Sequence, residues 1–253
     1  MLCDDPTVRT GLLLSGGLDS SILLGHLLDL GHRVQPFYIR SQLVWEEEEL
    51  RAVRRFLQAI RSPPLGDLVV LDLPLADLYG DHWSVTGRGI PDGASPDEAV
   101  YLPGRNALLV VKAAVWCQLN GVGRLALGVL GSNPFTDATA GFFEALESAL
   151  GLALDARIRI IRPFAQLDKR RVMELGRSLP LGLTFSCLAP VGRRHCGQCN
   201  KCAERKAAFR LIGADDPTRY AVAEPVGFRV QGSVCLRRRG APNPESRTLN
   251  PEP

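Results

Sequence analysis

The sequence predicts an α/β fold with a doubly wound, mainly parallel sheet. Short apolar runs alternate along the chain with longer segments whose apolar residues recur at helical spacing. The short runs contain few polar positions, and strands buried on both faces are typical of parallel sheets that helices cover. A glycine-rich loop follows the first run, and sheets of this kind bind ligands beyond the carboxyl ends of their strands.

Composition and charge exclude several classes of protein. The 253 residues suffice for one large domain, or for one domain with a small appendage. No apolar run approaches the roughly 20 residues that a membrane-spanning helix needs, and the acidic start is unlike a signal peptide. A net charge of +3 leaves no basic stripe of the kind that nucleic-acid binding requires. We therefore expect a cytoplasmic protein without a membrane or nucleic-acid partner.

The elements are expected in a regular order. The predicted strands are residues 8–14, 34–39, 68–71, 124–130 and 158–161. The predicted helices are residues 46–60, 106–120, 141–150, 168–178 and 201–211, with a first helix that Ser20 and Ser21 cap and Gly31 ends. Residues 80–100 hold four glycines and two prolines with little periodicity, which predicts a long surface loop.

This order divides the chain into three parts. We expect an α/β domain over residues 1–180 and a cysteine-rich region over residues 181–220 that packs on it. Residues 221–253 form a C-terminal extension, which its composition predicts to be disordered from about residue 237.

Residues 15–20, Ser-Gly-Gly-Leu-Asp-Ser, predict a phosphate-binding loop. Paired glycines let backbone N–H groups approach a phosphate closely, and the N-terminus of the next helix adds a partial positive charge. The hydroxyls of Ser15 and Ser20 can donate to phosphate oxygens, while Asp19 is suited to hold Mg²⁺. An ordinary strand-to-helix turn is the alternative. The predicted contacts are Leu14, Ser15, Gly16, Gly17, Leu18, Asp19, Ser20 and Ser21.

A cluster of four cysteines predicts a metal site. They are Cys187, Cys196, Cys199 and Cys202, spaced C-x8-C-x2-C-x2-C. Four thiolates satisfy tetrahedral Zn²⁺, and the short spacings suit a tight knuckle. Zinc is favoured over three alternatives, which are an iron–sulfur cluster, a redox dithiol and a coincidental spacing. His195 adjoins a ligand and is expected at the surface, Cys117 is expected in the core, and Cys3 and Cys235 lack matching partners.

These motifs resemble those of known enzymes. Residues 15–20 at the end of a first strand resemble the PP-loop ATP pyrophosphatases, which cleave ATP to pyrophosphate while they adenylate a substrate oxygen. With the tetracysteine pattern added, residues 8–220 resemble the 7-cyano-7-deazaguanine synthase family of queuosine biosynthesis. The other segments that resemble this family are residues 101–106, 125–129, 167–169, 174–175 and 184–187.

The resemblance implies an ATP- and Mg²⁺-dependent ligase that contains Zn²⁺. Such an enzyme activates the carboxylate of 7-carboxy-7-deazaguanine as an acyl-adenylate and converts it with free ammonia to an amide. A second activation dehydrates the amide to the nitrile, 7-cyano-7-deazaguanine. A homodimer is implied as well.

Catalytic roles follow from this chemistry. Negative charge that builds on departing pyrophosphate requires fixed cations, for which Lys169 and Arg105 are the candidates beside the magnesium ligand Asp19. A solvent-exposed lysine and an arginine that caps a helix are the alternatives. Three further residues are expected at the ATP site, where the Tyr38 backbone faces adenine: Tyr38, Gly104 and Gly128.

The sequence departs from the family at residues 131–141, where the family usually has Ser-Gly-Tyr-Pro-Asp-Cys-Arg-Pro. Asp137 is kept, but the Cys-Arg that follows it in the family is missing. The family's Asp-Tyr-Gly-Gln-Arg-His after the second strand is also replaced, by residues 38–42 with Arg40. We expect Asp137 and Arg40 to bind the substrate, an arginine being suited to its carboxylate.

Three other functions remain open at this point. A paralogue could adenylate a different carboxylate or attach a deazaguanine to another molecule. A tRNA-thiolating PP-loop enzyme would need a catalytic cysteine near the ATP site and a basic RNA surface, which the clustered cysteines and the near-neutral body disfavour. A non-enzymatic nucleotide-binding module is disfavoured by the presence of Asp19, Ser20 and Lys169.

Overall fold

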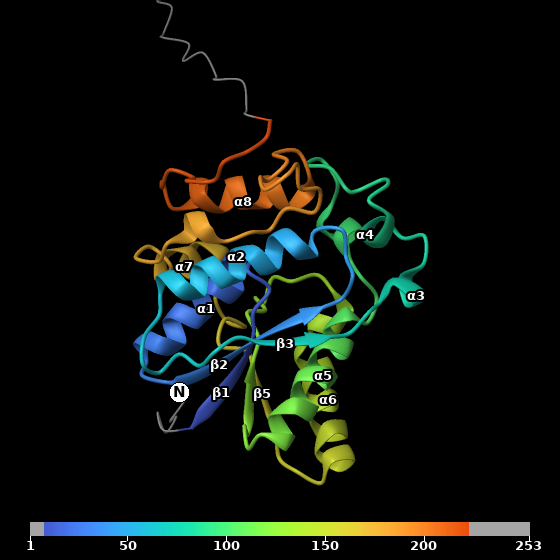
Figure 1. The fold of residues 1–253 in the computed structure, drawn as a ribbon, viewed down its shortest axis with the longest axis vertical. Helices are drawn as coiled ribbons and strands as arrows, with labels where there is room; N and C mark the ends of the chain where they lie inside the picture. Colours follow the sequence, from blue (N-terminus) through green and yellow to red (C-terminus); the bar gives the residue numbers. More distant parts are fainter. Residues whose placement is uncertain (1–7, 223–253) are drawn as a thin grey trace, which may run out of the picture. The chain divides into compact units, whose positions relative to one another are not determined.

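A parallel sheet of five strands forms the centre of the fold (Figure 1). The computed structural model describes residues 8–222, so the predicted tail and two of the cysteines, Cys3 and Cys235, lie outside it. The strands are β1 (Arg9–Leu13), β2 (Arg33–Arg40), β3 (Val69–Asp72), β4 (Arg124–Ala126) and β5 (Arg159–Ile161). They lie in the order β3-β2-β1-β4-β5, and each neighbouring pair is parallel. The predicted α/β fold is confirmed.

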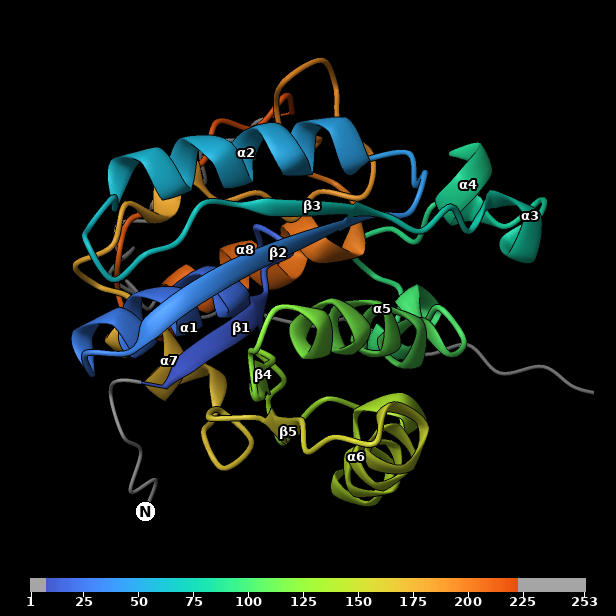
Figure 2. The same cartoon turned by 60° about the horizontal axis from the view of Figure 1, so that its bottom comes forward.

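Helices cover both faces of the sheet, as Figure 2 shows. One face carries α1 (Leu18–Asp29), α2 (Glu46–Ala59), α7 (Lys169–Leu175) and α8 (Asn200–Leu211), and the other carries α5 (Arg105–Leu119) and α6 (Ala140–Leu154). Successive strand residues point to opposite faces, so in β2 Phe37 joins the core under α5 while Tyr38 joins the core under α1. Cys117 is buried in the core under α5, as predicted.

The predicted element bounds need three corrections. The first helix begins at Leu18 with Gly17 as its N-cap, so Ser20 and Ser21 lie inside its first turn and do not cap it. The fourth strand ends at Ala126, because the chain leaves the sheet there to form the loop that approaches α1. The predicted loop over residues 80–100 contains two short helices, α4 (Trp83–Thr86) and η1 (Asp97–Val100).

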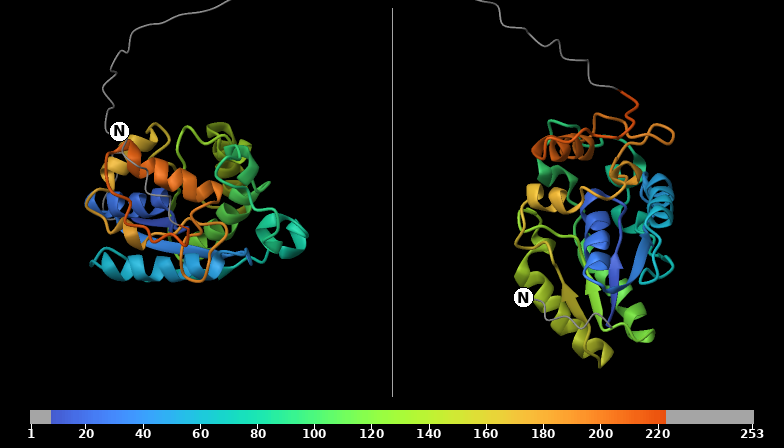
Figure 3. Two further views of the ribbon diagram at one scale, coloured as in Figure 1. Left: turned by 90° about the horizontal axis from the view of Figure 1, so that it is seen from above. Right: turned by 90° about the vertical axis from the view of Figure 1, so that its left-hand side faces the viewer.

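The segment that contains these short helices packs against the cysteine-rich region. Together with α3 (Ala76–Tyr79), α4 projects beyond the tip of β3 (Figures 2 and 3). Trp83 of α4 stacks on Trp45 with ring centroids 5.8 Å apart. The backbone of Gly93 donates to Gln198 at 2.8 Å, and that of Asn200 donates to Pro91 at 3.0 Å. These contacts fix the start of α8 over the carboxyl ends of the strands.

The remaining short elements are η2 (Thr136–Ala138) and η3 (Leu181–Leu183). None of the helices between residues 8 and 222 is long and apolar enough to cross a membrane. The division into a domain over residues 1–180 and a region over residues 181–220 stays a prediction.

Candidate functional site

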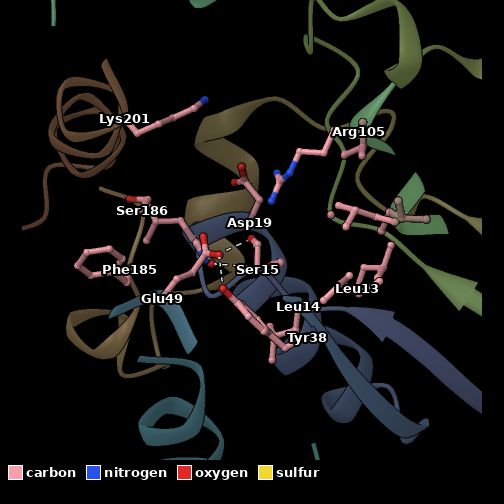
Figure 4. Close-up of a pocket in the computed structure, with 18 of the residues that line it drawn as sticks. Leu13, Leu14, Ser15, Asp19, Tyr38, Glu49, Arg105, Phe185, Ser186 and Lys201 are labelled. Carbon is pink, nitrogen blue, oxygen red and sulfur yellow. Dashed lines mark hydrogen bonds between the residues drawn. The ribbon is translucent and has the colours of Figure 1, made fainter. Parts of the chain in front are cut away.

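A pocket of about 300 Å³ opens at the carboxyl ends of β1, β2 and β4 (Figure 4). Most of the residues predicted to bind ATP line it: Leu14, Ser15, Gly17, Leu18, Asp19, Ser20, Tyr38, Arg105, Gly128 and Lys169. Three other predicted ATP contacts, Gly16, Ser21 and Gly104, stand outside the lining, as do the two predicted substrate residues, Arg40 and Asp137. The fold therefore brings the glycine-rich loop, the α5 start and the α7 start together.

The glycine-rich loop has a backbone that only glycine accommodates well. Gly16 has φ +80°, and a Cβ there would lie 2.8 Å from a methyl group of Val53. Its carbonyl accepts a hydrogen bond of 2.7 Å from the backbone N–H of Phe185, which ties the loop to the cysteine-rich region. The hydroxyls of Ser15 and Ser20 lie 3.1 Å apart. The loop thus presents two hydroxyls beside the N-terminus of α1.

Gly128 has a steric reason for its position. A Cβ at this residue would lie 3.0 Å from the backbone nitrogen of Ser20. The chain after β4 therefore passes directly against the first turn of α1, and a larger residue would push the two apart.

Four charged side chains form an ionic cluster at the mouth of the loop: Asp19, Lys169, Lys201 and Glu204. The ammonium of Lys169 donates to both carboxylate oxygens of Asp19, at 2.8 and 2.9 Å, and to Glu204 at 3.1 Å. Lys201 donates to the other oxygen of Glu204 at 2.6 Å. The cluster joins the starts of three helices that are far apart in the sequence, α1, α7 and α8.

The pKa values in the ionic cluster favour the charged forms. Burial works against ionisation of Glu204, but the charges of Lys201 and Lys169 outweigh it and lower the pKa of the carboxyl to about 2. Burial also opposes the charged form of Lys169, yet Asp19 and Glu204 raise the pKa of its ammonium. Sequence reasoning missed Lys201 and Glu204, because they follow no recognisable motif except that Lys201 stands between two cysteines.

A buried pair, Tyr38 and Glu49, lies on another wall of the pocket. The Tyr38 hydroxyl donates to a carboxylate oxygen of Glu49 at 2.8 Å. Burial raises the pKa of Glu49 to about 7, although the charge of Arg105 and the Tyr38 hydrogen bond oppose the shift. Burial and the Glu49 carboxylate also raise the pKa of Tyr38. Sequence reasoning missed Glu49, which stands in a run of four glutamates that is typical of a solvated helix start.

Arg105 extends into the pocket opposite Lys201 in Figure 4. Its Nε is buried, and among residues 8–222 this atom has no hydrogen-bond partner. Arg105 is the first residue of α5, whose N-cap is Gly104 with φ +71°. The guanidinium is therefore held near the glycine-rich loop by the start of a helix.

The two predicted substrate residues have partners within the protein. The Asp137 carboxylate is buried and accepts hydrogen bonds from the backbone and side-chain nitrogens of Asn106, at 3.0 and 3.2 Å. Arg40 is half-exposed and pairs with Glu46, with Glu47 and with a third carboxylate, that of Asp72. Asp137 does not itself line the pocket, but it contacts Asn106, which does. Substrate binding by Asp137 and Arg40 stays a prediction.

The four cysteines form a buried cluster that fits a metal ion. Their sulfur atoms all lie within 4.8 Å of one another. Two of the separations are 3.8 Å (Cys196 to Cys202) and 3.9 Å (Cys199 to Cys187), and a tetrahedral ion with bonds of about 2.3 Å to sulfur requires about 3.8 Å. Backbone N–H groups of Cys196, Leu188, Gln198 and Cys199 donate to the sulfurs. Such donors stabilise thiolates, so the arrangement suits a structural metal.

His195 is not at the surface, as its sequence position suggested, but 5% exposed. Its ring packs against Phe185 with centroids 4.4 Å apart, and its Nε2 accepts a hydrogen bond of 3.2 Å from the backbone of Ser186. Burial and the nearby charge of Arg205 lower the pKa of this imidazole to about 3. It is therefore a neutral packing residue between the metal cluster and the pocket.

The start of α8 belongs to both sites. Cys199 is the N-cap of α8 and Cys202 lies in its first turn, while Lys201 and Glu204 line the pocket. Arg205 is fully buried beneath them and donates to Thr184, to Leu181 and to a third partner, Thr218. Residues of the metal cluster and of the ionic cluster thus alternate at the start of α8.

The comparison with known families agrees with this geometry. Residues 10–213 match the family model described as queuosine biosynthesis protein QueC. The chain belongs to this family. Its glycine-rich loop, ionic cluster and cysteine cluster all lie within the matched residues, so the QueC match covers the complete pocket.

Three curated relatives are named as 7-cyano-7-deazaguanine synthases. The 7-cyano-7-deazaguanine synthase 1 of Desulfitobacterium hafniense (strain Y51) is 34% identical over 205 residues, which cover 79% of this chain and 90% of the relative. That of Desulfotalea psychrophila is 30% identical over 221 residues, or 83% and 98% of the two chains. The chain spans about half (49%) of a longer relative from Sulfurisphaera tokodaii, at 27% identity and with 87% of this chain covered.

A similar solved structure is less alike in sequence. The U34-tRNA thiolase NcsA from Methanococcus maripaludis has a TM-score of 0.48 and 11% identity, covering 84% of this chain and 75% of its own. A likeness at this level does not bear on function.

Proposed function

We propose that this protein is an ATP-dependent carbon–nitrogen ligase that makes 7-cyano-7-deazaguanine from 7-carboxy-7-deazaguanine. The observation that carries the proposal is one pocket in which the glycine-rich loop and the ionic cluster meet, in a chain that belongs to the QueC family. The curated relatives are named for this synthase. ATP is the expected nucleotide because transfer of its AMP group to a carboxylate oxygen turns that oxygen into a leaving group.

The first activation joins the substrate to AMP. A carboxylate oxygen of the substrate bonds to the α-phosphorus of ATP, the bond to the bridging oxygen breaks, and pyrophosphate leaves with its electron pair. Lys169 and Arg105 are the cations we assign to the charge on the departing pyrophosphate. Ser15, Ser20 and the N-terminus of α1 bind phosphate oxygens. Asp19 is the residue that would hold Mg²⁺, which neutralises charge on the phosphates.

The nitrogen enters in the second stage. Ammonia attacks the acyl carbon, loses a proton, and AMP leaves to give the amide. A second ATP adenylates the amide oxygen with release of pyrophosphate and a proton. Loss of AMP and a second proton from this species forms the nitrile. We propose that free ammonia in solution is the nitrogen source.

Further parts of the proposal concern the assembly. The four thiolates are proposed to hold Zn²⁺, which would stabilise the start of α8 without entering the reaction. A homodimer in the cytoplasm is proposed from the family resemblance. Metal analysis of the purified protein tests the first part, and a brown protein with visible absorption would point to an iron–sulfur cluster instead.

The function is tested by product analysis. The protein is incubated with 7-carboxy-7-deazaguanine, ATP, MgCl₂ and ammonium, and we expect AMP, pyrophosphate and a product whose mass is that of the nitrile. Reactions without the acid or without ammonium are the controls. An enzyme that binds ATP but forms neither amide nor nitrile would contradict the proposed substrate and leave ATP binding intact.

A second candidate is a paralogous reaction on a different carboxylate. The observation in its favour is that Asp137, the residue kept from the family's substrate segment, has its carboxylate engaged by Asn106. A panel of heteroaryl carboxylates, screened for pyrophosphate release, distinguishes the two candidates.

A further inference from the structure

The first turn of α8 carries a lysine, Lys201, that belongs to none of the motifs described above. It stands between Cys199 and Cys202, yet its side chain lines the nucleotide pocket. Successive helical residues point about 100° apart, so the cysteines face the metal cluster while Lys201 faces the pocket. Figure 4 shows it reaching in from the side opposite Arg105, with Asp19 between them in this view.

The two lysines of the ionic cluster differ in how many of their hydrogen-bond donors have a partner. A lysine ammonium has three N–H donors. Lys169 makes three short contacts to carboxylate oxygens, two to Asp19 and one to Glu204. In the described part of the chain Lys201 makes one hydrogen bond, to Glu204, and its side chain is 31% exposed. Lys201 therefore has two donors left for a ligand, whereas Lys169 would have to exchange one of its carboxylate partners to donate to a phosphate.

The balance of charge in the pocket also favours Lys201 as a ligand-binding residue. The carboxylates of Asp19 and Glu204 balance the two lysines. The other cations that line the pocket are Arg105 and the buried Arg205, whose donors are bound to other residues. A triphosphate carries several negative charges, and binding it in a pocket with paired carboxylates calls for cations with donors to spare. Lys201 meets that need on the side of the loop where the ionic cluster lies.

The position of Lys201 is fixed from two directions. Glu204 holds its ammonium at 2.6 Å from the next turn of the same helix. The helix start is held by the buried cysteines and by Asn200, whose side chain donates to the backbone of Ser95 at 2.9 Å. A lysine held in this way loses less side-chain entropy when it binds a ligand than a freely moving one.

We propose that Lys201 is a further phosphate-binding cation of this site, held in place by Glu204 and by the cysteine-bound start of α8. The proposal rests on the proposed function, because it takes the ligand to be ATP. It adds to Lys169 and Arg105 a residue that the glycine-rich loop and the other motifs do not identify.

The test is ATP binding by a Lys201→Met variant, which keeps an unbranched side chain, one atom shorter, and removes its charge. Titration calorimetry with ATP and Mg²⁺ should show affinity about 10- to 100-fold below that of the wild type, the loss expected for one charge-assisted hydrogen bond. Adenosine, which has no phosphates, should bind the variant and the wild type equally in ligand-observed NMR. Lys201→Arg should restore most of the ATP affinity.

The matched control is Lys112→Met, which removes the same charge from an exposed position on α5 outside the pocket. Both variants should keep the wild-type metal content, because all four cysteines are present. Equal ATP affinity of the Lys201→Met and Lys112→Met proteins, or an equal loss of adenosine binding, would overturn the inference alone. A wild-type protein that bound no ATP would overturn the proposed function with it.

Discussion

Two glutamates line the same pocket and differ by about five units in acidity: the pKa of Glu204 is about 2 and that of Glu49 is about 7. Glu49 is buried and Glu204 is partly buried, with 37% of its side chain exposed, and the loss of contact with water on its own disfavours the charged form. Glu204 has two lysine ammonium groups within hydrogen-bonding distance, whereas the nearest partner of Glu49 is the neutral hydroxyl of Tyr38. The charges of the two lysines, together with the greater exposure of Glu204, thus keep this carboxyl charged, whereas Glu49 lacks both.

The difference separates two kinds of work inside one pocket. The ionic cluster keeps fixed charges beside the glycine-rich loop at every pH near neutrality, so its residues are suited to phosphate chemistry. In the buried pair, the Glu49 carboxyl gains or loses a proton in the physiological pH range. The free energy of unfolding therefore depends on pH in that range. Substitutions in the first region should change turnover, and those in the second should change stability and its dependence on pH.

The largest effect is expected from Asp19→Asn in the ionic cluster. This change removes a charge that pairs with Lys169 and that we assign to Mg²⁺, so kcat/KM should fall about 100-fold or more. Steady-state pyrophosphate release measures the loss. Because the Asp19 side chain is 27% exposed, thermal unfolding should change little. An active Asp19→Asn enzyme would contradict the proposed role of the cluster.

Glu49→Gln should change stability rather than turnover. In the folded protein the Glu49 carboxyl keeps its proton up to about pH 7, against 4.5 for the ordinary group. The folded state binds this proton more tightly than the unfolded state does. The stability that the protonated Glu49 carboxyl contributes is therefore complete below about pH 4.5 and is lost as the pH rises through 7. Glutamine has no such loss, and the variant should be more stable than the wild type at about pH 8, by about 1–3 kcal/mol.

Urea unfolding of both proteins at about pH 5 and about pH 8 measures this difference. The two should be similar in acid and diverge as the pH rises. A variant that is less stable at the higher pH would show that Glu49 is charged there and that the contrast between the two glutamates is wrong.

The smallest effect is expected from Asp137→Ala. The Asp137 carboxylate accepts a hydrogen bond of 3.0 Å from the backbone of Asn106 in the first turn of α5, as an N-cap residue would. Its removal should cost about 1 kcal/mol of unfolding free energy. Chemical unfolding measures that cost. If the KM for the carboxylate rises as well, Asp137 also contacts the substrate.

Much of the fold and part of the site could be predicted from the sequence. Buried parallel strands such as β2 are short segments with few polar residues, and the glycine-rich loop and the cysteine knuckle are local patterns whose chemistry depends on spacing. Lys201 and Glu49 could not be found in this way, because their roles depend on which side chains other elements bring near them. His195 was placed wrongly for the same reason, since Phe185 and the cysteine region fold over it.

The hydrogen bond from Phe185 to Gly16 has a consequence for how this site comes into being. The loop is synthesised before Lys169, which pairs with Asp19 and follows it 150 residues later. Phe185 and the cysteines leave the ribosome later still. A nascent chain therefore contains the complete Ser-Gly-Gly-Leu-Asp-Ser motif before it has a nucleotide site. A fragment that ends before α7 would contain this motif without a complete nucleotide site.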